Sequence, residues 1–120
     1  MYKRRTGRSC VFKNHVHLVF VAKYRKKIFN KPILNRIKEI FKQTCQQMDV
    51  ALIEFGGEYD HIHLLVNVPP KLAIANLVGK LKRKSSYFLR REFLDILKNK
   101  LWGKHLWSPS YCVVSCGGDL

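Results

Sequence analysis

The sequence has few acidic residues, no long apolar run and no paired cysteines. Only 8 of its 120 residues are Asp or Glu, against 23 Lys and Arg, so the formal net charge is +15. No apolar run reaches the roughly 18 residues that a membrane-spanning helix needs. The basic residues 1–5 lead into an alternating stretch, which does not match a signal peptide. We therefore expect no membrane segment and a cytoplasmic location.

The four cysteines are irregularly spaced and form no C-x-x-C pair; they are Cys10, Cys45, Cys112 and Cys116. This spacing does not match a zinc knuckle or a redox site. We expect ordinary buried thiols in a reducing cytoplasm rather than disulfides or metal ligands.

The excess of positive charge indicates a polyanionic partner. So many like charges repel one another in a folded protein, and a polyanion relieves that repulsion. The basic composition favours nucleic acid as this polyanion, although a ribosome-associated protein or a membrane-surface binder would also be basic. The chain is 47% hydrophobic and shows no repeat or linker, so residues 1–120 are expected to form a single domain.

Residue types and hydrophobic periodicity predict an alternation of strands and helices. Strands are predicted over 10–24, 50–55, 61–68 and 111–116, helices over 33–48, 73–93 and 94–101, a turn over 56–60 and a loop over 102–110. This βαββαβ order is typical of an α+β, ferredoxin-like sandwich, in which both long helices cover one face of an antiparallel sheet. The other face stays open, as in RRM-like domains, and can bind single-stranded nucleic acid.

The predicted strand over 61–68 carries the residues with the most specific chemistry. Side chains on a strand alternate between its faces, so Ile62 and every second residue after it face the core. His61 and His63 then share the open face, where two imidazoles can reach one metal ion at about 2 Å each. The spacing alone does not decide the matter, because His15 and His17 repeat it in the first strand.

The surrounding residues distinguish the two histidine pairs. Residues 56–66, GGEYDHIHLLV, resemble the signature strand of the HUH endonucleases, in which two histidines flank a hydrophobic residue. They resemble more closely the insertion-sequence transposases of the TnpA, single-tyrosine (IS200-like) type. Residues 17–25, HLVFVAKYR, are similar to that family's first strand, and residues 106–111, LWSPSY, to the segment before its last strand. The resemblance covers nearly the whole chain, with the motifs in family order.

The resemblance implies a homodimeric DNA transposase of the prokaryotic cytoplasm, associated with the nucleoid and without a small-molecule substrate. Such proteins recognise hairpins at the ends of a mobile element and cut and rejoin single-stranded DNA through a 5′-phosphotyrosine intermediate. The resemblance assigns His61 and His63 as catalytic ligands of Mg²⁺ or Mn²⁺, with a polar third ligand, and gives His15 and His17 no such part. Asp60 is expected to cap the turn, orient a histidine or join the metal ligands.

The nucleophile is where this sequence departs from the family pattern. The family's tyrosine lies on a helix after the last strand, with a glutamine one turn later, and no residue before Leu120 matches either. Tyr111 is a weak candidate, because it matches a structural tyrosine of the family instead. Whether the chain is truncated or comes from a decayed element, we expect it to bind DNA without cleaving it.

Basic residues form two clusters that we predict to contact DNA. The first lies in the loop after the first strand and comprises Lys23, Arg25, Lys26 and Lys27; the second lies on the helix over 73–93 and comprises Lys80, Arg83, Lys84 and Arg91, beside Tyr87. Trp102 and Trp107 are expected to be core or loop anchors. Two other function classes remain: a non-catalytic ferredoxin-like module for single-stranded nucleic acid, and a structural basic protein. The module would carry Phe or Tyr where this open face carries histidines, and the structural protein needs no histidine pair.

Overall fold

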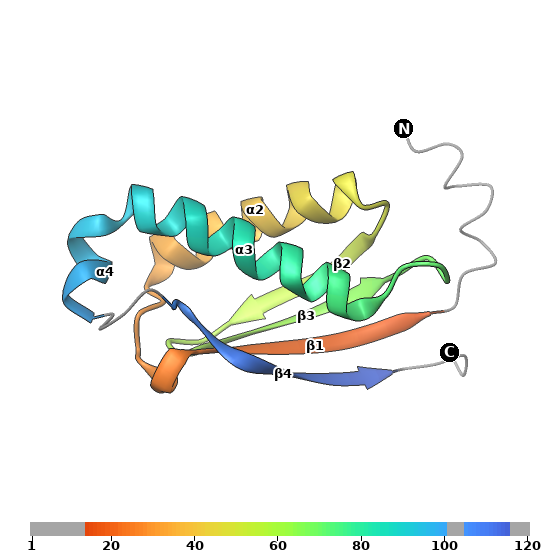
Figure 1. The fold of residues 1–120 in the computed structure, drawn as a ribbon, viewed down its shortest axis with the longest axis horizontal. Helices are drawn as coiled ribbons and strands as arrows, with labels where there is room; N and C mark the ends of the chain where they lie inside the picture. The colour runs from red at the N-terminus through yellow and green to blue at the C-terminus, as the bar shows by residue number, and fades with distance from the viewer. Residues whose placement is uncertain (1–13, 101–104, 116–120) are drawn as a thin grey trace.

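The computed structural model describes residues 14–100 and 105–115. They form, in order, β1 (His15–Ala22), the 3-10 turn η1 (Lys23–Arg25), α2 (Lys31–Gln47), β2 (Ala51–Gly57), β3 (His61–Asn67), α3 (Ile74–Glu92), α4 (Leu94–Lys100) and β4 (Trp107–Ser115). The strands form one antiparallel sheet in the order β2-β3-β1-β4. Helices α2 and α3 lie on one face of this sheet, and no described element covers the other (Figure 1). The predicted α+β, ferredoxin-like arrangement is confirmed.

Helix α2 begins and ends at residues suited to those positions. The side chain of Asn30 accepts a hydrogen bond from the backbone N–H of Ile33 at 2.9 Å, which caps the first turn. Pro32 follows in that turn, where its missing N–H costs nothing. At the other end Asp49 takes a left-handed conformation, φ 61°, and the chain reverses there into β2.

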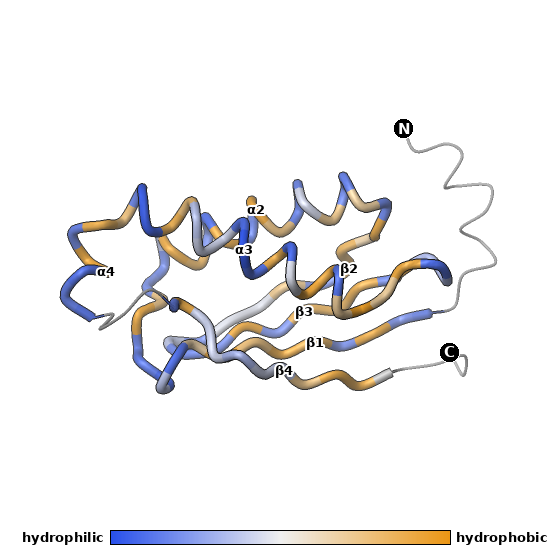
Figure 2. Tube along the Cα trace, viewed as in Figure 1, coloured by the Kyte–Doolittle hydropathy of each residue, from blue (hydrophilic) through white to orange (hydrophobic). Residues whose placement is uncertain are grey.

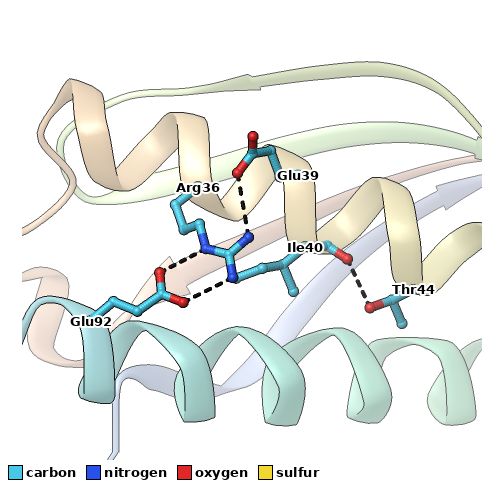
Figure 3. Close-up of polar contacts among 5 residues, drawn as sticks. All are labelled: Arg36, Glu39, Ile40, Thr44 and Glu92. Carbon is cyan, nitrogen blue, oxygen red and sulfur yellow. Dashed lines mark hydrogen bonds and ion pairs between the residues drawn. The ribbon is translucent and has the colours of Figure 1, made fainter.

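Helices α2 and α3 are joined at the surface by a pair of ionic hydrogen bonds. Arg36 of α2 donates to both carboxylate oxygens of Glu92 in α3, at 2.7 and 2.9 Å, and also to Glu39, at 3.3 Å (Figure 3). The hydrogen bonds from Arg36, more than its charge, lower the pKa of Glu92. This pair fixes one end of α3 relative to α2.

The core lies between the sheet and the two long helices. Phe20 of β1 is fully buried, with its ring edge-on to Phe41 at 5.8 Å and to Trp107 at 5.7 Å between centroids. The indole N–H of Trp107 donates to the Ser85 hydroxyl of α3 at 3.0 Å, so this buried polar atom has a partner. Trp107 is therefore a core anchor, as predicted. Hydrophobic and hydrophilic segments alternate along α2 and α3, as amphipathic helices require (Figure 2).

Several predicted boundaries were wrong. The first strand ends at Ala22 and not at residue 24, because residues 23–25 form the 3-10 turn η1. Gly56 and Gly57 belong to β2 and pair with β3, so the predicted turn shrinks to residues 58–60. Strand β4 begins at Trp107 and contains Pro109, in a segment predicted as a loop. Proline is tolerated there because β4 is an edge strand, whose outward N–H groups need no ladder partner.

Some predictions fall outside the described residues: the start of the first strand at 10–13, the last residue of the third helix, the part of the loop over 102–104, Trp102, Cys10 and Cys116. Of the other cysteines, Cys45 is buried, as predicted, but Cys112 is an exposed free thiol. None of the described helices combines the length and apolarity needed to cross a membrane.

Candidate metal and DNA site

Strand β3 places its two histidines together on the face that the helices leave open. Ile62 between them is fully buried, whereas His61 is half-buried and His63 exposed. In the antiparallel register His61 lies opposite Val21 and His63 opposite Val19 of β1. The centroids of the two imidazole rings are 6.5 Å apart, and half of that separation leaves room for a nitrogen–metal bond of about 2 Å from each ring.

Asp60 orients His61. One carboxylate oxygen of Asp60 lies 3.0 Å from Nδ1 of His61, and the other accepts a hydrogen bond from Nε of Arg25 at 3.3 Å. The hydrogen bond with His61 and then the contacts with Arg25 lower the pKa of Asp60. An ionised carboxylate at Nδ1 favours the tautomer that donates from this nitrogen, which leaves the lone pair of Nε2 for a metal ion. Of the roles expected for Asp60, the geometry shows the orienting one.

Gly56 provides the surface on which the ring of His63 lies. Gly56 pairs with His63 across β2 and β3. A Cβ atom built on Gly56 would lie 2.6 Å from both Cε1 and Nε2 of His63. The imidazole therefore needs bare backbone beneath it, which is a reason for glycine inside a strand. Sequence reasoning assigned this glycine to a turn and missed its relation to the site.

The two histidines suit part of a divalent-metal shell. Within residues 14–100 and 105–115, no group of three or more His, Cys, Asp or Glu side chains is placed to share one ion. His61 and His63 would thus supply two nitrogen ligands and leave the other positions to oxygen atoms. An open shell of this kind suits Mg²⁺ or Mn²⁺, which keep several waters and bind substrate phosphates.

The second histidine pair lies on the same face but further along the sheet. His15 is opposite Asn67 and His17 is opposite Leu65, so both sit beyond the position of His63. The structure does not join the two pairs into one cluster. His15 and His17 are thus a matched control within the chain, with the same spacing on the same open face.

The two basic clusters occupy different sides of the domain. Lys23 and Arg25 lie in η1, at the end of the sheet where β3 begins (Figure 1). The α3 cluster lies in the helical layer, where Arg83 and Arg91 are exposed and the guanidinium of Arg91 stands 5.0 Å from the centroid of Tyr87. The structure therefore brings Lys23 and Arg25, and not the α3 cluster, to the end of the sheet where His61 lies. A cavity of about 330 Å³ on α3 is lined by Lys80, Arg83, Lys84, Tyr87 and Phe88.

Comparison with known proteins shows the family of this chain. Residues 10–119 match the family described as IS200-like transposase. The chain belongs to the IS200-like transposase family. It is 35% identical over 111 residues to the ISDra2 transposase TnpA of Deinococcus radiodurans, covering 91% of this chain and 77% of that protein. It is also 35% identical over 101 residues to the transposase of insertion sequence IS200 from Salmonella typhimurium, covering 84% of this chain and 66% of that protein.

Solved structures show the same fold. A crystal structure of a candidate transposase from Deinococcus radiodurans superposes with a TM-score of 0.79 at 32% identity, covering 87% of this IS200-like transposase and 79% of that chain. A REP-associated tyrosine transposase bound to a REP hairpin superposes with a TM-score of 0.67 at 7% identity, covering 90% and 59% of the two chains. At this low identity the second comparison supports the fold alone.

Tyr111 of this IS200-like transposase is not beside the histidine pair. It lies opposite Phe20 in β4, so its ring faces the helices, 6.5 Å from the Phe20 ring and 5.6 Å from Nζ of Lys82. His61 and His63 face the other way. The exposed tyrosines at the histidine end of the sheet are Tyr24 in η1 and Tyr59 in the β2–β3 turn, and sequence reasoning gave neither a role.

Proposed function

We propose that this chain is the metal- and DNA-binding core of a transposase that cuts and rejoins single-stranded DNA at hairpin ends, with His61 and His63 holding Mg²⁺ or Mn²⁺. The observation that carries the proposal is the pair of imidazoles on the open face, one of them oriented by Asp60. Membership of the IS200-like family gives these residues a reaction to serve.

The residues around the pair suit a phosphodiester substrate. A bound divalent ion would stabilise negative charge on the phosphate under attack. His61 presents Nε2 because Asp60 holds Nδ1, and Arg25 links Asp60 to the basic turn. The phosphates that flank the reacting one would meet the positive charge of Lys23 and its neighbours, which displaces condensed counterions from the DNA.

The covalent step that we propose is attack by a tyrosine hydroxyl on the phosphate, which forms a 5′-phosphotyrosine and releases a 3′-OH. The covalent link keeps the energy of the phosphodiester bond for rejoining. Tyr111 faces the core rather than His61 and His63. We therefore propose that the described residues bind DNA and position the metal ion. We do not propose Tyr111 as the nucleophile.

The α3 cluster is proposed to hold the paired stem of a hairpin. Arg83 and Arg91 are exposed on the helical layer, away from the histidines, so one DNA molecule that meets both basic clusters must pass around the edge of the domain. A hairpin with a single-stranded flank has this shape. The REP-associated tyrosine transposase with the same fold was solved with a hairpin bound.

A homodimer formed by strand pairing is also proposed. Strand β4 pairs with β1 on one side only, so its other edge carries no partner among the described strands. Val113 and Val114 near this edge are 42% and 57% exposed. An unpaired edge with exposed apolar side chains is a ready template for a second copy of the same strand. Sedimentation of the wild-type chain tests this, with the expected species twice the mass of 14.1 kDa.

The test of function is a denaturing gel together with a binding assay. Labelled single-stranded DNA with a hairpin and a flank is incubated with wild type, His61→Ala and His17→Ala, with and without Mn²⁺. We expect Mn²⁺ to tighten binding for wild type and for His17→Ala, but not for His61→Ala. The His17 variant controls for the loss of an imidazole from the same face.

The two assays together distinguish the candidate functions. An SDS-resistant adduct that His61→Ala abolishes would show a complete nucleophilic site. Metal-dependent binding without an adduct would show a transposase core that holds DNA and metal only. Binding that ignores the metal and both histidine substitutions would favour the non-catalytic single-strand-binding module, and no binding at all would refute the proposal.

A further inference from the structure

The turn between β1 and α2 has an unusual backbone. Tyr24 has φ 59° and ψ 20°, and Arg25 beside it has φ 53°, so two consecutive residues with side chains are left-handed. This conformation is normally left to glycine, or to isolated Asn and Asp, because Cβ crowds the backbone. A chain that only had to change direction here would be better served by glycine.

Neighbouring segments hold this turn in its strained shape. The N–H of Ala22 donates to the carbonyl of Asp60 at 2.9 Å, and the N–H of Lys23 donates to the carbonyl of Leu106, also at 2.9 Å. These bonds attach the turn to the start of β3 and to the segment before β4. Strain that the surroundings maintain in this way is characteristic of functional sites.

Side-chain burial does not compensate for the strain in this turn. Tyr24 is 73% exposed and the side chain of Arg25 is 70% exposed. The phenol ring projects beside Nζ of Lys23, which lies 5.3 Å from its centroid. Arg25, the next residue, contacts the carboxylate that orients His61. The turn therefore presents an exposed aromatic ring between two cationic residues, Lys23 and Arg25. Arg25 connects the turn to His61 through Asp60.

We propose that Tyr24 is a stacking platform for an unpaired base of the DNA strand in the histidine site, with the phosphates of that nucleotide lying against Lys23 and Arg25. This rests on the proposed function, because the base belongs to the strand that His61 and His63 would process. Aromatic faces bind bases with little sequence preference, and adjacent cations neutralise the backbone. The left-handed turn sets the direction of the ring and links it to the metal site through Arg25 and Asp60.

Tyr24→Gly separates this role from a structural one. Glycine relieves the left-handed strain, so this variant is expected to melt at a higher temperature than wild type while binding DNA less tightly. A tyrosine that only supports the fold would give a lower melting temperature when removed. Tyr24→Phe keeps the ring and should bind as wild type does. Tyr59→Ala removes an exposed tyrosine at the same end of the sheet that is not left-handed, and is the matched control.

The assay uses a hairpin-free oligonucleotide with 2-aminopurine placed at each position in turn, in EDTA so that no metal contributes. Wild type, Tyr24→Phe and Tyr59→Ala should quench the fluorescence of one position. Tyr24→Gly should lose the quenching and raise Kd about tenfold, within the usual range for one stacked base. Equal Kd and quenching for Tyr24→Gly and wild type would overturn the inference alone, as would equal losses for Tyr59→Ala and Tyr24→Gly. Failure of wild type to bind both this oligonucleotide and the hairpin DNA with Mn²⁺ would overturn the proposed function as well.

Discussion

Replacing Gly56 by alanine tests whether the ring of His63 must lie on bare backbone. The added Cβ would stand 2.6 Å from two atoms of that ring, and ordinary contact begins at 3.4 Å, so the imidazole must move by 0.8 Å (3.4 − 2.6) or turn away. Metal sites hold their ligand distances within about 0.2 Å. A ligand displaced by several times that tolerance loses the orientation that its surroundings provide, which typically weakens metal affinity by about 10- to 100-fold.

The assay is Mn²⁺ titration followed by electron paramagnetic resonance, with a thermal melt of each variant. Gly57→Ala is the matched control on the next residue, because its Cβ would lie 2.7 Å from Cδ2 of Leu34 on the opposite face of β2. Crowding of this kind costs about 1–3 kcal/mol. We expect Gly56→Ala to lose Mn²⁺ affinity with an unchanged melting temperature, and Gly57→Ala to melt lower with smaller loss of affinity.

Unchanged Mn²⁺ affinity in Gly56→Ala, with reduced affinity in His63→Ala, would show that the ring of His63 does not need bare backbone beneath it. If His63→Ala itself changed nothing, His63 would not be a ligand, and the metal proposal would fail instead. The two failures are therefore distinguishable in one set of titrations.

Two further predictions concern stability and thiol chemistry. Glu92→Gln should lower the melting temperature by about 2 °C at pH 7, since a partly exposed ion pair contributes about 0.5 kcal/mol after screening by solvent. Because Arg36 lowers the pKa of Glu92 in the folded state, that stabilisation is full above the unfolded-state pKa. The difference between variant and wild type should thus vanish as the pH falls through the lowered pKa, and a pH-independent difference would contradict this account. Burial raises the pKa of Cys45 to about 12, so maleimide at pH 7.5 should label Cys112 in native protein and Cys45 only in denaturant, as peptide mapping by mass spectrometry can show.

The order of strands and helices along the chain and the core face of each strand followed from the sequence, because hydrophobic alternation is a local property. Ile62 and Leu64 had to share one face, and burial confirms that they do. The boundaries at Gly56 and Pro109 were wrong for the same physical reason. Glycine and proline are read as turn residues, yet a strand accepts glycine where a ring lies against it and proline where its outer edge is unpaired. Both conditions depend on neighbours that are distant in sequence.

The shared face of the two histidines was predictable from the sequence, and the contacts that support them were less so. His61 and His63 come from one strand, so their shared face followed from the period of two. The contact of Arg25 with Asp60 joins residues 35 positions apart, and sequence reasoning gave Arg25 only a DNA contact. The inward ring of Tyr111 depends on the register between β1 and β4, which alternation in either strand alone does not fix. The left-handed turn at Tyr24 was not predictable, because the residues that adopt it are not glycine.

The alternation of β3 also limits how this protein can evolve. One seven-residue strand supplies core residues and the two histidines of the proposed metal site, on alternate positions. Substitution can tune either set separately, but an insertion or deletion of one residue inside the strand would exchange the two faces beyond it. A residue such as His63 would then face the core, and a core residue such as Leu64 would face solvent. Folding and chemistry would be lost together. Length changes should be excluded from β3 and tolerated only in loops that do not support the histidine site.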